Sequence, residues 1–94
     1  MLETATLKTY NVSMPTIFRY KGFRFFFYSN EGEPIEPLHV HVVKGENVAK
    51  FWIDPEISVV ESYGMKPHEL NELCKVIKEK EKLIRTAWNE YFGS

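Results

Sequence analysis

The aromatic run at residues 23–29, FRFFFYS, restricts the fold of this chain more than any other stretch. The segment TIFRY at residues 16–20 precedes it, and Lys21 and Gly22 lie between the two, which is the pattern of a β-hairpin with a tight turn. By alternation, one side of the second strand carries Phe23, Phe25 and Phe27, and the other side carries Arg24, Phe26 and Tyr28. A strand that is apolar on both sides is usually central in its sheet and covered on both faces. We therefore expect a helix on one face, and a partner chain or a second protomer on the other.

Three further strands are expected after this hairpin, at residues 38–43, 48–54 and 57–63. The segment before them, NEGEPIEP, is predicted to be a loop because of its glycine, its two prolines and its charges. Pro37 has no N–H to donate to a sheet, so the first of the three strands starts after it, and Pro55 ends the second. The third run is short, so the pattern predicts a sheet of four or five strands.

The C-terminal third of the chain has the spacing of an amphipathic helix. Its apolar side chains recur at intervals of three, four or seven residues: Leu70, Leu73, Cys74, Ile77, Ile84, Trp88 and Tyr91. Pro67 suits the first helical position and Gly93 suits the end. The charge run KEKEK at residues 78–82 holds neither glycine nor proline, so we favour one helix of about 25 residues, roughly 37 Å long. A break at that run, giving two helices, is the alternative.

Together these patterns predict an α+β fold. We expect a small twisted antiparallel sheet of four or five strands, with a long C-terminal helix, unbroken or broken at the charge run, packed on one face. Residues 1–13 show no clear period and are interpreted as a weakly ordered extension. Residues 14–94 are interpreted as one domain, which agrees with a length of 94 residues.

Charge and cysteine content exclude several classes of protein. The net charge of −1 argues against a large nucleic-acid-binding surface, although a local basic patch remains open. The single cysteine, Cys74, cannot form an internal disulfide and lies on the apolar stripe of the helix. No apolar run is long enough to span a membrane, and residues 1–13 lack the pattern of a signal peptide, so we expect a cytoplasmic protein. We expect no cofactor.

Two histidines, His39 and His41, stand two positions apart in the stretch EPLHVHVVKG. Residues two apart in a strand share a face, so the imidazoles are expected to be neighbours. They provide half of a metal site, and a catalytic zinc would need a third ligand. The candidates for that ligand are His68, Asp54, Glu33 and Glu36. The other interpretations are acid–base chemistry or RNA contact, and a structural or interface role at the sheet surface.

Arg24 and Lys50 extend this set. If the strands at residues 23–29, 38–43 and 48–54 are neighbours, alternation places Arg24, His39, His41 and Lys50 on one face. Two cations and two imidazoles resemble the active-site groups of a metal-independent ribonuclease, in which histidine transfers protons and a cation stabilises the charge on the phosphate. These four are therefore the candidate catalytic residues. The alternative is a half-solvated sheet face, on which the stems of Arg24 and Lys50 cover aromatic rings.

Several stretches resemble a small bacterial family known only as a domain of unknown function. They are MPTIFRYKGFRFFFYSNEGEP, HVHVVKG, AKFWIDP and ELNELCKVIKEKEKLIRTAWNEYF, which together run from residue 14 to residue 92. The resemblance implies that the protein is encoded beside a second small protein and that the two form a toxin–antitoxin module. It implies no reaction. Residues 1–13 fall outside the pattern, and Lys66 stands where the family often has a serine or threonine that caps the helix.

Three hypotheses about function follow. The first is one component, more specifically the toxin side, of a toxin–antitoxin-like pair that acts on RNA and binds a small protein from a neighbouring gene. The second is a non-catalytic binding or regulatory module, alone or as a homo-oligomer. The third is a small metal-dependent enzyme that uses His39 and His41.

Overall fold

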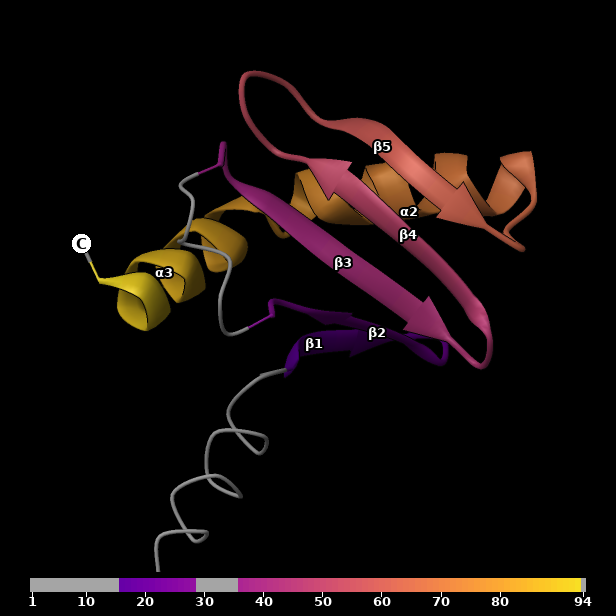
Figure 1. The fold of residues 1–94 in the computed structure, drawn as a ribbon, viewed down its shortest axis with the longest axis horizontal. Coiled ribbons are helices and arrows are strands. Elements are labelled where there is room, and N and C mark those ends of the chain that lie inside the picture. The colour runs from indigo at the N-terminus through magenta and orange to yellow at the C-terminus, as the bar shows by residue number, and fades with distance from the viewer. Residues whose placement is uncertain (1–15, 29–35, 94) are drawn as a thin grey trace, which may run out of the picture.

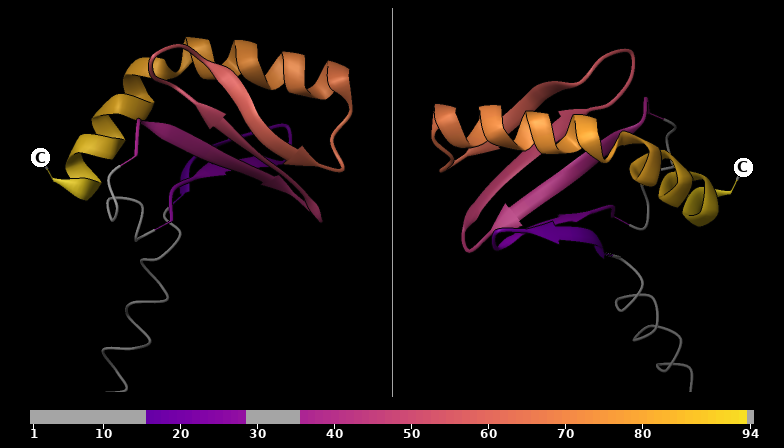
Figure 2. Two further views of the ribbon diagram at one scale, coloured as in Figure 1. Left: turned by 45° about the horizontal axis from the view of Figure 1, so that its top comes forward. Right: turned by 180° about the vertical axis from the view of Figure 1, so that it is seen from behind.

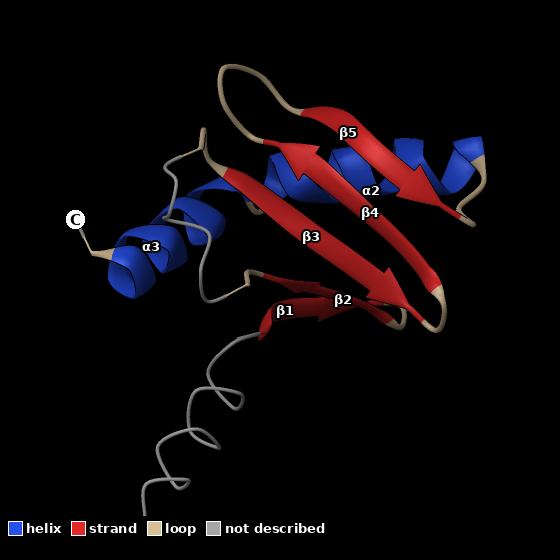
Figure 3. Ribbon diagram, viewed as in Figure 1, coloured by secondary structure: helices blue, strands red, loops and turns tan. Residues whose placement is uncertain are grey.

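A computed structural model describes residues 16–28 and 36–93. Its elements are β1 (Thr16–Tyr20), β2 (Phe23–Phe26), β3 (His39–Lys44), β4 (Asn47–Trp52), β5 (Ser58–Tyr63), α2 (Pro67–Glu79) and α3 (Glu81–Phe92). The predicted α+β class is confirmed, with five antiparallel strands followed by two helices (Figures 1 and 3). The predicted strands are all present, with ends shifted by a few residues. The extension expected at residues 1–13 lies outside the described residues.

The sheet is an open meander in which each strand pairs with the next in the sequence. The strand order is β1-β2-β3-β4-β5, and every pairing is antiparallel. The turn between β1 and β2 explains their antiparallel pairing. Lys21 and Gly22 have φ values of 48° and 85°. Two successive left-handed residues make a tight turn whose twist matches that of the flanking strands. Glycine adopts this conformation without steric cost. The expected hairpin is therefore present.

Both helices lie on one side of the sheet. In Figure 1 the strands are in front of α2, and in the view from behind in Figure 2 α2 is in front of the strands. Helix α3 continues past the end of the sheet at which β3 begins. No described helix lies across the opposite face, which we call the open face; α3 reaches it only at the end where β3 begins, where Trp88 packs against His39. Among the described residues, neither helix has the length and apolar character needed to cross a bilayer.

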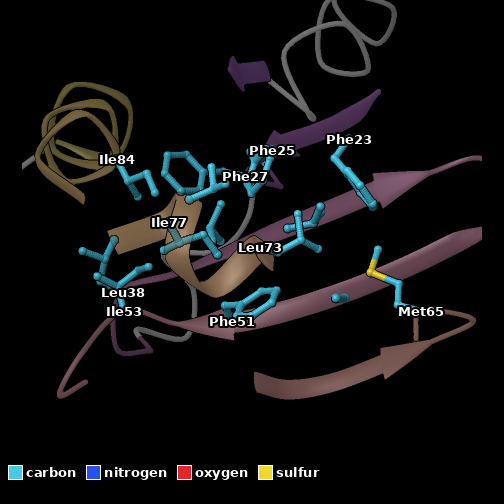
Figure 4. Close-up of a cluster of buried hydrophobic side chains, with 14 residues drawn as sticks. Phe23, Phe25, Phe27, Leu38, Phe51, Ile53, Met65, Leu73, Ile77 and Ile84 are labelled. Carbon is cyan, nitrogen blue, oxygen red and sulfur yellow. The ribbon is translucent and has the colours of Figure 1, made fainter. Parts of the chain in front are cut away.

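The hydrophobic core fills the space between the sheet and the helices. Figure 4 shows side chains from the sheet, such as Phe25 and Phe51, meeting Leu73 and Ile77 of α2 and Ile84 of α3. All five are fully buried. Phe23, Phe25 and Phe27 lie in this core, as alternation predicts. The helices therefore cover the side of β2 that carries these three rings.

The C-terminal helix is broken at Lys80, so the favoured prediction of one continuous helix is wrong and its alternative is correct. A straight helix of about 25 residues would be roughly 37 Å long, whereas six-residue strands span only about 20 Å. A straight helix would therefore carry its second half beyond the sheet. The break turns α3 around the end of the sheet, so that Ile84 is fully buried in the core and Trp88 packs edge-on against Phe27, with ring centroids 5.1 Å apart.

An ion pair holds α3 at this angle. The Arg85 guanidinium lies 2.6 Å from Asp54, just beyond β4, and 2.8 Å from Glu81 in the first turn of α3. Hydrogen bonds to these two carboxylates raise the pKa of Arg85. All three side chains are about half exposed, so the pair positions α3 and adds little to stability.

A second contact joins the β1–β2 hairpin to α2. The Tyr20 hydroxyl donates to Glu72 at 2.5 Å, and the Lys21 ammonium lies 3.3 Å from the same carboxylate. The hydroxyl and the ammonium hold the pKa of Glu72 below its ordinary value of 4.5. The ionised carboxylate is thus favoured in the folded chain.

This contact predicts a pH-dependent stability difference between the wild type and Glu72→Gln. Because the pKa is lowered on folding, the ionised Glu72 stabilises the fold above the unfolded-state pKa, and this contribution is lost as the pH falls through the folded-state pKa. We expect the wild type to melt at a higher temperature than the variant at neutral pH, and the difference to shrink by about pH 3. Melting curves at the two pH values provide the measurement. An equal difference at both would contradict the assignment.

Candidate functional site

The open face is organised by one row of side chains that crosses four strands. Phe26 of β2 stands opposite His41 of β3, His41 stands opposite Lys50 of β4, and Lys50 stands opposite Glu61 of β5. His39 lies two positions from His41, and Arg24 two positions from Phe26, on the same face. The structure therefore brings Arg24, His39, His41 and Lys50 onto one face. The prediction required β2, β3 and β4 to be neighbours in the sheet, and they are.

The two histidines differ in their surroundings. His39 is 1% exposed, because its ring is packed against Trp88 of α3 at 5.4 Å and against Trp52 of β4 at 5.7 Å. Its Nδ1 lies 2.9 Å from the carbonyl oxygen of Pro37. A carbonyl only accepts, so Nδ1 is the donor and carries a proton. A side chain this deeply buried is positioned to support its neighbours, and contact with a ligand would fall to His41.

His41 lies in an aromatic setting that opens to solvent. Its ring centroid is 4.5 Å from that of Tyr28, 5.6 Å from that of Phe26 and 5.2 Å from that of His39. Its side chain is half-buried, and Tyr28 beside it is exposed. The imidazole of His41 is thus fixed by rings and remains accessible.

Arg24 and Lys50 each lie over an aromatic ring on this face. The Arg24 guanidinium is 4.7 Å from the centre of Phe26, and its Nε donates to the Thr16 hydroxyl at 2.6 Å. The Lys50 ammonium is 4.9 Å from the centre of Trp52. Such cation–π contacts hold a charge near the surface while its apolar stem covers a ring.

Glu36 links Lys50 to His39. One carboxylate oxygen of Glu36 lies 3.1 Å from the Lys50 ammonium and 3.7 Å from Nδ1 of His39. Lys50 is therefore engaged by a residue from the segment before β3. Its cross-strand neighbour Glu61 is not the residue that pairs with it.

A shallow pocket opens between His41 and the edge of the sheet. It has a volume of about 340 Å³, and its walls include Tyr28, His41, Lys50, Glu61, Ser62 and Tyr63. Tyr63 is 71% exposed, although it is a large aromatic residue in a strand. The walls of the pocket thus combine aromatic residues, a histidine, a lysine side chain and a glutamate.

Sequence reasoning missed Glu61 and Tyr63. Both lie on the alternation of β5 that faces Lys50 and Val48. The pairing of β4 with β5 shifts register between Lys50 and Phe51, and nothing in the sequence marks that shift. The available signal was the run ESY itself, an acidic and an aromatic residue on one side of an edge strand.

The residues considered as a third metal ligand lie apart or are already engaged. His68 is exposed at the start of α2, Asp54 pairs with Arg85, and Glu33 lies outside the described residues. Glu36 lies near His39 and pairs with Lys50. Within residues 16–28 and 36–93, no three histidine, cysteine or acidic side chains are grouped so as to hold a metal ion.

Comparison with protein families identifies the family of this chain. Residues 22–89 match the domain of unknown function DUF4160. The chain belongs to this family. The DUF4160 region begins at the turn before β2 and includes the open-face residues from Arg24 to Tyr63 as well as most of α3. It leaves β1 outside. No curated protein and no solved structure matches the chain, so the family carries no functional assignment to this site.

Proposed function

We propose that the protein binds single-stranded RNA on the open face of its sheet and is the toxin-side component of a toxin–antitoxin-like pair. The RNA proposal rests on one observation, which is that cations lie over aromatic rings on that face. Arg24 lies over Phe26 and Lys50 over Trp52, beside a pocket lined by Tyr28 and Tyr63.

This combination suits a single strand of RNA. Unpaired bases stack on aromatic side chains exposed by a sheet, and cations next to them contact the phosphates. Exposed rings such as Tyr28 and Tyr63 offer stacking surfaces, and the cations lie within the same face. The net charge of −1 limits the contact to a few phosphates, so the salt dependence of binding should be shallow.

RNA binding in solution tests the proposal directly. The affinity for a fluorescein-labelled single-stranded RNA octamer is measured by anisotropy at several salt concentrations. Tyr63→Ala is expected to weaken binding by about tenfold, since base–aromatic stacking contributes about 1–3 kcal/mol per base. Lys50→Ala should weaken binding and reduce the salt slope by about one, as loss of one phosphate contact does.

Lys75→Ala is the matched control for Lys50→Ala. Lys75 is an exposed lysine of α2, on the side of the sheet away from the open face, so its loss changes the net charge equally. Its affinity should stay within about twofold of the wild type. Equal losses for the two lysine variants, or no binding even at low salt, would refute an open-face site.

The toxin part of the proposal is tested by growth. Induction of the wild type should arrest growth, His41→Ala at a matched soluble level should not, and co-expression of the neighbouring-gene protein should restore growth. His41 is the variant of choice because it is accessible, whereas replacement of His39 would also disturb packing. Harmless expression of the wild type, together with no binding of the neighbour, would rule out the toxin role.

The partner is proposed to add a strand to the sheet. Strand β5 is at one edge, and among the described strands it pairs only with β4. An edge strand presents unpaired backbone groups to which an extended segment of another chain can bind. The side chains of Val59, Glu61 and Tyr63 along this strand are exposed.

A binding or regulatory module without catalysis is the second candidate. The burial of His39 favours it, because only one of the two imidazoles is then accessible for proton transfer. RNA cleavage by acid–base catalysis commonly uses a proton donor as well as an acceptor. Incubation of labelled RNA with purified protein distinguishes the two: products absent from the His41→Ala reaction indicate catalysis, and intact RNA with retained binding indicates the module.

A further inference from the structure

We propose that the pocket beside His41 holds a single guanine base, which is recognised by the Glu61 carboxylate together with the Lys50 ammonium. The inference rests on the proposed RNA binding and adds the identity of one base. Two observations support it. Glu61 lies at the wall of the pocket, and its cross-strand neighbour Lys50 pairs with Glu36 instead.

The Glu61 carboxylate is available to a ligand. Its cross-strand neighbour is Lys50, yet the Lys50 ammonium pairs with Glu36 at 3.1 Å. Within the described part of the chain, Glu61 makes no ion pair or side-chain hydrogen bond, and its side chain is exposed at the wall of the pocket. Both of its oxygens can therefore accept hydrogen bonds from a bound molecule.

A free carboxylate is unfavourable at a general RNA surface. Negative charge repels phosphates, and binding that depends on phosphates alone gains from cations only. A glutamate within an aromatic pocket is advantageous when it contacts a base edge that carries donors. The chemistry of the pocket therefore points to base recognition.

Guanine is the base whose hydrogen-bonding edge fits this pair. Its Watson–Crick edge presents two adjacent donors, N1–H and N2–H, followed by the acceptor O6. A carboxylate takes two parallel N–H donors in a bidentate arrangement, as it does with arginine. The Lys50 ammonium has three donors and Glu36 uses one, so one donor remains for O6 and one for the phosphate contact proposed above. Adenine, cytosine and uracil do not present two adjacent ring-edge donors.

The rest of the pocket suits a stacked purine. Tyr28, His41 and Tyr63 provide ring surfaces around a space of about 340 Å³, which is large enough for one base. The pocket opens beside His41, so the phosphate attached to the bound nucleoside would lie towards the cations of the open face.

The test measures base preference at one position. Four fluorescein-labelled uridine octamers carry A, C, G or U at one central position, and their affinities for the wild-type full chain are compared with those for Glu61→Gln. We expect the G octamer to bind the wild type about tenfold more tightly than the all-uridine octamer, as a bidentate contact provides. Glu61→Gln should abolish that preference, because an amide places a donor against a guanine donor.

Glu46→Gln is the matched control. It removes the same charge from an exposed position in the β3–β4 turn, and it should retain the preference for G. Uniformly tighter binding of all four octamers by Glu61→Gln, with no preference in the wild type, would show only repulsion and would overturn the inference. Equal wild-type affinities, or a preference for another base, would overturn it and leave RNA binding intact. Failure to bind any octamer would overturn both.

Discussion

His39→Ala is expected to lower the free energy of unfolding by about 3–5 kcal/mol. The ring is 1% exposed and fills the space between Trp52 and Trp88, so its removal leaves a cavity. The same change deprives the Pro37 carbonyl of its donor. His41→Ala, on the half-buried neighbour, should cost only about 1 kcal/mol. Urea denaturation followed by tryptophan fluorescence measures both, since two tryptophans flank His39.

His39→Phe separates packing from hydrogen bonding. It keeps an aromatic ring of similar size and removes the donor to Pro37, so the expected loss is about 1–3 kcal/mol. If His39→Ala costs no more than His41→Ala, the two histidines are equivalent and the division of roles between them is wrong. If His39→Phe costs as much as His39→Ala, the hydrogen bond dominates.

Phe51→Ala is expected to destabilise the fold to a similar extent, by about 3–5 kcal/mol. Phe51 is fully buried in β4, where it faces the helices (Figure 4). A small domain has a total stability of roughly 5–15 kcal/mol, so one such loss removes a large share of it. The melting temperature should fall by more than about 12 °C, which circular dichroism can follow.

Val48→Ala is the control in the same strand. Val48 is an exposed side chain of β4 on the open face, and its truncation should cost about 0.5 kcal/mol. Comparable losses for the two variants would mean that the open face is covered to the same degree as the helix face. That result would count against a ligand site there.

Much of the fold follows from local patterns. The alternation in FRFFFYS, the Lys21-Gly22 turn and the prolines at the ends of strands are each determined by neighbouring residues, so they could be identified from the sequence. The charge run was identified as the place for a break, but whether the helix breaks there depends on the length of the sheet against which it packs. The run KEKEK contains no helix breaker, so the sequence there has no signal of its own.

The candidate site was predictable only in part. Alternation places His39, His41, Arg24 and Lys50 on one face once the strands are neighbours. The burial of His39 was not predictable, because it depends on Trp88, far along the chain in α3. Glu61 was missed because its place opposite Lys50 depends on a register shift in the β4–β5 pair. These are tertiary features, and neither has a local cause.

The sequential strand order also has a consequence for the chain during its synthesis. Because each strand pairs with the one before it, the sheet can assemble as the chain leaves the ribosome and is complete once Tyr63 has emerged. At that stage Phe25 and Phe51 have no cover from α2 and α3, which come afterwards. A nascent sheet with an uncovered apolar face is prone to aggregate. The chain is therefore most exposed to aggregation between the synthesis of β5 and that of α3.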